Sequence, residues 1–213
     1  MTMSDKGRQV LASVESKRGY TLPYHRMMAA SSPDLLAAYD AFYEQLTLVS
    51  RILTPVERET VWAGLLAAAR EVHGFIHMKR AEKAGMGRDD IARAVAIAAV
   101  AQSWEIFSFS GTHWSAWTMP EIVEQRYLAL FETARGDLEP KLAHLVALVC
   151  HGACRREEAM VLHLRHAFAA GITPDQVAEG LSYMIIPCGG NTLIEAVSYW
   201  EEAAKRGLFP SPS

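Results

Sequence analysis

Residues 156–178, REEAMVLHLRHAFAAGITPDQVA, repeat residues 70–92, REVHGFIHMKRAEKAGMGRDDIA, 86 positions earlier in the chain. Eight of the 23 aligned positions are identical, where average composition would give roughly one or two by chance. The chain is therefore predicted to contain one structural unit twice. Both copies keep an arginine at their first position and a histidine seven residues later: Arg70 with His77, and Arg156 with His163.

Helix start and stop signals recur in both copies. Residues 54–57 (TPVE) and 173–176 (TPDQ) each give an N-cap threonine, a proline at the first helical position and a Glu or Gln three residues after the cap. Gly85 and Gly171 stand where a left-handed C-cap would end the repeated helices. No segment shows the alternation of a strand. The sequence predicts an all-α fold, with further helices at residues 32–48 and 120–131.

The repeat also suggests how the chain is divided. We expect a first repeat at residues 51–134 and a second at residues 135–213, with a turn at 135–137 between them. Two repeats of about 85 residues are small enough to pack as one compact domain. Residues 1–50 belong to neither repeat, but they are apolar and aromatic enough to pack over a core. We expect them to form a helical N-terminal extension or lid.

Composition and charge exclude several classes of protein. The formal net charge is −3 and acidic and basic residues are dispersed, so no basic surface for nucleic acid is expected. No stretch approaches the roughly 20 apolar residues of a membrane span, and the first residues lack a secretory signal, so we expect no membrane partner and a cytoplasmic location. Cys150, Cys154 and Cys188 form no C-x-x-C motif, which argues against a dithiol redox centre.

Helical geometry predicts where the repeated Arg and His pairs lie. If each stretch is a continuous helix, a step of 100° per residue puts Arg156 and His163 on the same small-residue face, and Arg70 and His77 likewise. A cation on an apolar face needs an anionic partner or a cavity. Each arginine could be a structural ion-pair residue and each histidine a hydrogen-bonded core residue. Because both residues were retained through the duplication, a functional role is as well supported as this structural role.

Glu59 and the other histidines are further candidates for a site. Glu59 stands in an otherwise apolar predicted helix that leads into the first copy, where it could orient a histidine. His73 and His77 have the i, i+4 spacing of a metal site, but the second copy has Ala159 at the position of His73, and we expect no metal. The other histidines are expected at interfaces or on the surface: His25, His144, His151 and His166.

The second copy, continued by Tyr183-x-x-x-Pro187 and Leu193-x-x-Ala196, resembles the gamma-carboxymuconolactone decarboxylase family, which shares its fold with alkylhydroperoxidase D. The resemblance covers most of residues 50–205. It implies an all-helical subunit, association around three-fold axes and a site where helices of neighbouring repeats meet. The peroxidase branch carries a C-x-x-C-x-x-x-His helix, whose thiols both copies of this chain lack. The decarboxylase branch commonly has an acidic residue where Ala159 stands.

The resemblance and the residues together suggest a function. We expect a cofactor-free decarboxylase, or a related lactone- or enol-processing enzyme, that acts on a small anionic ring-derived acid. Arginine would bind carboxylate or enolate oxygens and histidine would move the proton. The expected catalytic residues are Arg70, Arg156, His77, His163 and Glu59, with His73 and Tyr183 binding substrate. The alternatives are a non-catalytic binding protein of the same fold and, more weakly, a peroxidase. The protein is expected to be a homo-oligomer, with a trimer favoured.

Overall fold

The computed structural model describes residues 3–212, which form helices joined by turns and loops and contain no strand. The expected all-α fold is confirmed. The chain divides into two compact units, residues 1–50 and residues 51–213. No helix within residues 3–212 is both long enough and apolar enough to cross a membrane.

The first unit consists of three helices: α1 (Asp5–Arg18), α2 (Pro23–Ser31) and α3 (Pro33–Tyr43), the last continued by a π-helical turn, Glu44–Leu48. The helix expected to run from Ser32 to about Leu48 is therefore present, with its last five residues in the wider π form. The three helices enclose a small apolar core of Val14, Ala29 and Leu36.

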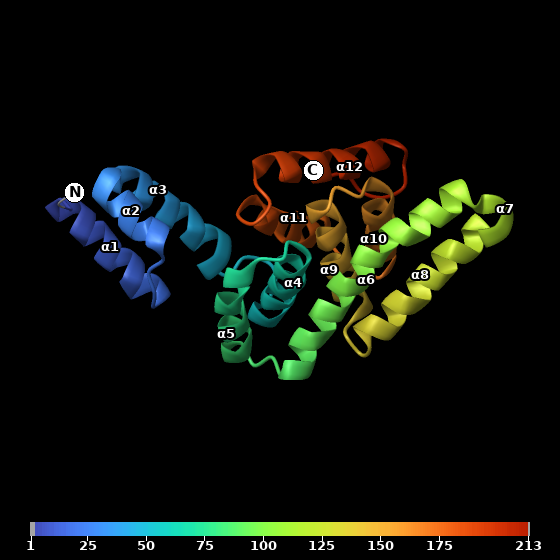
Figure 1. The fold of residues 1–213 in the computed structure, drawn as a ribbon, viewed down its shortest axis with the longest axis horizontal. Helices are drawn as coiled ribbons and strands as arrows, with labels where there is room; N and C mark the ends of the chain where they lie inside the picture. The colour runs from blue at the N-terminus through green and yellow to red at the C-terminus, as the bar shows by residue number, and fades with distance from the viewer. Residues whose placement is uncertain (1–2, 213) are drawn as a thin grey trace. The chain divides into compact units, whose positions relative to one another are not determined.

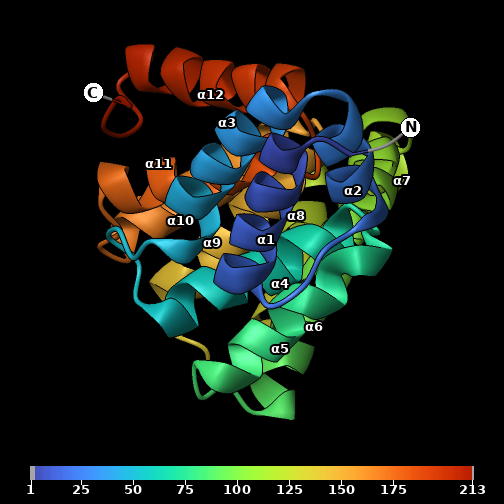
Figure 2. The same ribbon diagram turned by 90° about the vertical axis from the view of Figure 1, so that its left-hand side faces the viewer.

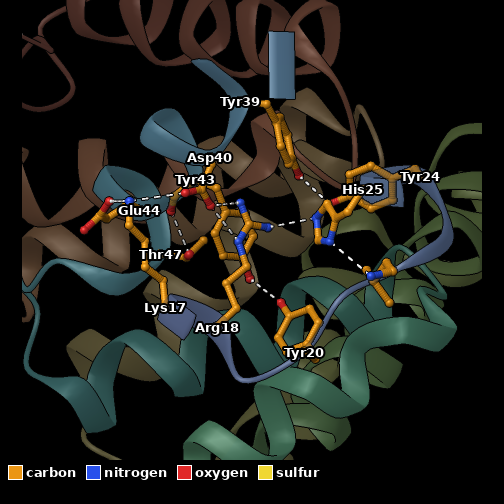
Figure 3. Close-up of polar contacts among 11 residues, drawn as sticks. Lys17, Arg18, Tyr20, Tyr24, His25, Tyr39, Asp40, Tyr43, Glu44 and Thr47 are labelled. Atoms are coloured by element: carbon orange, nitrogen blue, oxygen red, sulfur yellow. Dashed lines mark hydrogen bonds and ion pairs between the residues drawn. The ribbon is translucent and has the colours of Figure 1, made fainter. Parts of the chain in front are cut away.

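A polar cluster lies beside this small core (Figure 3). The Arg18 side chain is fully buried and donates from Nε and Nη2 to Oδ1 of Asp40, at 3.0 and 2.7 Å. Its guanidinium also lies 3.8 Å from the centre of the Tyr43 ring. His25 is fully buried and accepts at Nδ1 from the Leu22 backbone, and burial lowers its pKa to about 4. The expectation that His25 lies at an interface or on the surface is wrong.

The second unit contains the remaining helices, drawn from teal to red in Figure 1. Figure 1 and Figure 2 both show α12 along one edge of this unit. The elements are α4 (Pro55–Ala68), the 3₁₀ turn Val72–Gly74, α5 (Phe75–Lys83), α6 (Arg88–His113), α7 (Ser115–Thr118), α8 (Pro120–Arg135), α9 (Pro140–Ala153), α10 (Glu157–Ala169), α11 (Pro174–Ser182), the 3₁₀ turn Tyr183–Ile185 and α12 (Gly190–Lys205).

Local signals produce these helices as the sequence predicted. Thr54 and Thr173 each cap a helix through a complete capping box with the residue three positions later. Gly85 and Gly171 follow α5 and α10 with φ angles of 98° and 87°, a left-handed conformation that glycine adopts without a steric penalty. The expected helix from Pro120 is α8, which runs on to Arg135.

The core forms around α9, which is buried on nearly every side from Leu142 to Gly152 and packs against α4 and α10. A helix that is apolar all round belongs in the interior. The helices α4 and α9 cross at Gly64, where an added Cβ atom would lie 2.3 Å from Cγ1 of Val146. Glycine is therefore required for the two central helices to approach so closely.

The two copies contain corresponding helices, but the number of residues that separates equivalent positions is not the same along the whole repeat. The helices α4 and α9 each have 14 residues and begin at Pro55 and Pro140, which makes them equivalent at a separation of 85 rather than 86. The following turns agree with this spacing, because Arg70 and Arg155 both have φ near +57°. The separation returns to 86 only at His77 and His163. In the first copy a 3₁₀ turn replaces the start of the α-helix and absorbs the one-residue difference.

Candidate active site

The first repeat joins an acid and a base from different helices. Nδ1 of His77, on α5, lies 2.9 Å from Oε2 of Glu59, on α4. Glu59 is fully buried, whereas His77 keeps 7% of its surface exposed. The other carboxylate oxygen of Glu59, Oε1, accepts from Nε of Arg58 at 3.1 Å. Glu59 thus contacts one of the histidines that it could orient, and Arg58 is its additional partner.

The surroundings of His77 favour its neutral form. Burial lowers the pKa of His77, and the hydrogen bond to Glu59 offsets this effect in part. Because a carboxylate can only accept, it fixes the Nδ1 proton of His77 and directs Nε2 away from Glu59. Nε2 has no hydrogen-bond partner within residues 3–212. The pair can therefore take up a proton at Nε2 and release it again, which is the requirement for a general base or acid.

Aromatic rings support the histidine from one side. Trp62 stacks on His77 with ring centres 4.2 Å apart, and Tyr183 stacks on the other face of this pair, 4.9 Å from Trp62. The Tyr183 hydroxyl donates to Oε1 of Glu179 at 2.6 Å, and Oε2 of Glu179 accepts from the backbone of Ile52. Tyr183 is fully buried. It thus supports Trp62 from behind, and the structure does not place it where we expected a substrate contact.

His73 lies apart from this pair. It belongs to the 3₁₀ turn before α5, so it does not share a helical face with His77. Its exposed imidazole lies 3.1 Å from Glu71. No group of three or more His, Cys, Asp or Glu side chains within residues 3–212 is arranged to hold a metal ion. The structure thus gives His73 no place in the Glu59–His77 pair.

The expectation that Arg70 and Arg156 lie on the faces of the repeated helices is wrong. Arg70 lies in an exposed turn with left-handed backbone, before the helix begins. Arg156 is the N-cap of α10 and donates to Oε1 of Glu105, Oε1 of Gln102 and the carbonyl oxygen of Ala101. The projection at 100° per residue failed because neither arginine is inside a helix.

A cleft of about 530 Å³ lies beside Arg156. Three glutamates line it, and one of these, Glu105, binds Arg156. Among residues 3–212, the one arginine that lines this cleft is therefore already paired with a carboxylate. Its lining residues are Trp104, Glu105, Ser108, Phe109, Thr112, His113, Arg156, Glu157 and Glu158.

The second repeat contains the same histidine in different surroundings. Nδ1 of His163 lies 2.9 Å from Nδ1 of His144, and His144 occupies the position on α9 that Glu59 occupies on α4. Nε2 of His163 lies 2.8 Å from the Tyr127 hydroxyl, which also contacts Nε2 of His151 at 2.7 Å. His163 and His151 are fully buried and His144 nearly so. The expectation of interface or surface positions for His144 and His151 is wrong.

The surroundings of the histidines in this cluster favour their neutral form. Burial lowers the pKa of His144 to about 4 and that of His151 to about 3, and the pKa of His163 falls well below its usual value. With all groups neutral, each of the three contacts holds one proton, and the donors follow one direction along His151, Tyr127, His163 and His144, starting from either end. Both nitrogens of His163 are then occupied, so the second repeat holds a sealed counterpart of the site in the first.

Sequence reasoning named Glu59 and His77 and suggested that Glu59 could orient a histidine, but it missed most of the neighbours of this pair. Arg58 and Trp62, on the same helix as Glu59, were not singled out. The two copies were aligned with a constant separation of 86 residues, and this alignment does not pair His144 with Glu59, which are 85 residues apart. A comparison started at Pro55 and Pro140, each of which follows a possible cap, would have revealed it.

Comparison with known proteins agrees with this duplicated architecture. The sequence model of the carboxymuconolactone decarboxylase family matches the chain twice, over residues 33–110 and 120–202. The first match begins with α3 and contains Glu59 and His77, and the second begins with α8 and contains His163. Curated protein sequences give no significant match. Because the two matches cover most of its length, the chain belongs to the carboxymuconolactone decarboxylase family.

Proposed function

We propose that the chain is a cofactor-independent carboxy-lyase, or a related lactone- or enol-processing enzyme, that acts on a small anionic ring-derived acid. The observation that carries this proposal is the 2.9 Å contact between His77 and Glu59, with Nε2 of the imidazole left for a ligand. Membership of the family supports the reaction class. We propose that the reaction takes place in the first repeat, because both nitrogens of His163 contact other side chains.

The proposed reaction replaces a carboxylate by a proton. Loss of CO2 breaks a carbon–carbon bond, and its electron pair passes into a conjugated lactone carbonyl to give an extended enolate. Nε2 of His77 then donates a proton to carbon, and solvent returns one to the imidazole. An anionic substrate beside His77 raises the pKa of the histidine and so favours the protonated form that this step needs. Glu59 holds Nδ1–H and stabilises the imidazolium.

Turnover of 4-carboxymuconolactone and a panel of related lactone acids tests the proposal. His77→Gln should lower kcat by about 10²- to 10⁴-fold, the usual contribution of a general acid or base. Glu59→Gln should lower it less, because the imidazole loses only its orienting partner. Lys83→Gln changes an exposed residue of the same helix, α5, and should leave kcat unchanged.

Two outcomes would contradict the proposal. A folded His77→Gln variant that keeps kcat within about threefold of the parent would remove His77 from the chemistry. Thermal shifts with lactone acids, without any product from the panel, would instead support the alternative of a binding protein.

A further inference from the structure

Two hydrogen-bond donors beside the Glu59–His77 pair are buried without a partner. Nη1 of Arg58 and Nε1 of Trp62 are both inaccessible to solvent and have no acceptor within residues 3–212. Such orphaned donors are costly and uncommon in folded proteins. Their presence at one place suggests that an acceptor from outside the chain completes them.

The two donors share a helix face with the acid of the pair. Arg58 and Trp62 are four residues apart on α4, so their side chains are neighbours on the helix surface, about one turn apart. Arg58 bonds Oε1 of Glu59 while His77 bonds Oε2, so guanidinium and imidazole share one carboxylate. Trp62 stacks directly on His77. A group bound by these donors would therefore lie close to the proposed proton donor.

The charge of the guanidinium selects the kind of acceptor. The Arg58 side chain is only 12% exposed. Its Nε donates to Glu59, whereas Nη1 has no acceptor within residues 3–212. Arginine recognises carboxylates through parallel N–H donors. We propose that Arg58 and Trp62 bind the carboxylate of the substrate next to His77, in the role that the sequence suggested for Arg70 and Arg156. This inference rests on the proposed function only for the identity of the ligand as a substrate.

Binding of benzoate, measured by isothermal titration calorimetry with chloride as the comparison ion, tests this assignment without requiring turnover. Arg58→Met should weaken benzoate binding at least tenfold, and Arg58→Lys should weaken it less because the charge remains. Trp62→Phe keeps the stacked ring but removes Nε1 and should weaken binding several-fold. Arg88→Met removes an exposed arginine from the start of α6 and should leave the affinity unchanged.

Arg58→Met leaves Glu59 without one partner and can therefore fail to fold. The double variant Arg58→Met with Glu59→Gln removes both charges together and provides the same binding test. The inference would be overturned if wild-type protein failed to bind benzoate at about 100 mM. It would also be overturned if either folded Arg58→Met variant kept its affinity within threefold, or if Arg88→Met weakened binding as much.

The results separate this inference from the proposed function. Turnover of lactone acids that survives Arg58→Met would remove Arg58 from substrate binding and leave the role of His77 intact. Benzoate binding that depends on Arg58, without turnover of any lactone acid, would retain the anion site and refute the decarboxylase.

Discussion

Lowering the pH from 7 to 5 should destabilise residues 51–213, because the second repeat buries histidines in their neutral form. The pKa values of His144 and His151 are about 4 and about 3 in the folded chain, against about 6.5 in an unfolded chain. Between these values the unfolded chain binds more protons than the folded one. Stability is therefore complete above about pH 6.5 and is lost as the pH falls.

The size of the effect follows from these pKa values. Each extra proton bound by the unfolded chain costs about 1.4 kcal/mol per pH unit. Between pH 7 and pH 5, His144 and His151 should each cost about 2 kcal/mol, or about 4 kcal/mol together. His163 and His77, whose pKa values are also lowered, act in the same direction. A loss of this size is a large fraction of the stability of an ordinary domain.

Urea unfolding followed by tryptophan fluorescence at several pH values measures this slope. All five tryptophans lie between residues 62 and 200, so the signal reports on the second unit alone. His151→Leu introduces the residue found at the equivalent position of α4, Leu66, and should reduce the slope by about one proton. His113→Gln, at an exposed position, is the matched control and should not change it. A wild-type slope below one proton between pH 5 and 6, or an unchanged slope in His151→Leu, would refute the reasoning.

Three further predictions concern chemistry, packing and assembly. Burial raises the thiol pKa of Cys150, and that of Cys188 to about 11, so replacing all three cysteines by alanine should leave turnover intact; a folded variant with more than a tenfold loss would contradict a thiol-free mechanism. Gly64→Ala should destabilise by about 1–3 kcal/mol through its clash with Val146, whereas Gly111→Ala, with no atom closer than 3.9 Å, should be neutral or stabilising in thermal unfolding. We propose a trimer, which mass measurement in solution checks and a monomer at micromolar concentration would contradict.

The parts of the fold that could be predicted depend on local interactions. The capping boxes at Thr54 and Thr173 and the left-handed glycines at positions 85 and 171 involve only a few consecutive residues, so the sequence reveals them directly. The contact between Glu59 and His77 was foreseen only as a possibility. It joins two helices, and its support was a polar residue in an apolar segment.

The wrong predictions arose where the repeat was assumed to be an unbroken helix with a constant separation between its two copies. Arg70 and Arg156 were placed on helix faces because the repeat was treated as an unbroken helix, whereas a turn precedes α5 and α10. His144 was overlooked because one residue fewer separates α4 from α9 than separates His77 from His163. Sequence identity between the copies marked the histidines correctly but could not reveal which side chains surround them.

The replacement of an acid by an imidazole at equivalent positions, Glu59 and His144, has a consequence for how the two halves can change during evolution. Once one half performs the proposed proton transfer, selection acts on the other only through its contribution to folding. Substitutions around His163 should then be accepted whenever the interior stays filled and its hydrogen bonds stay satisfied. Substitutions around His77 face the additional demand of catalysis. Gene duplication would in this way have supplied one half as a support on which the other could specialise.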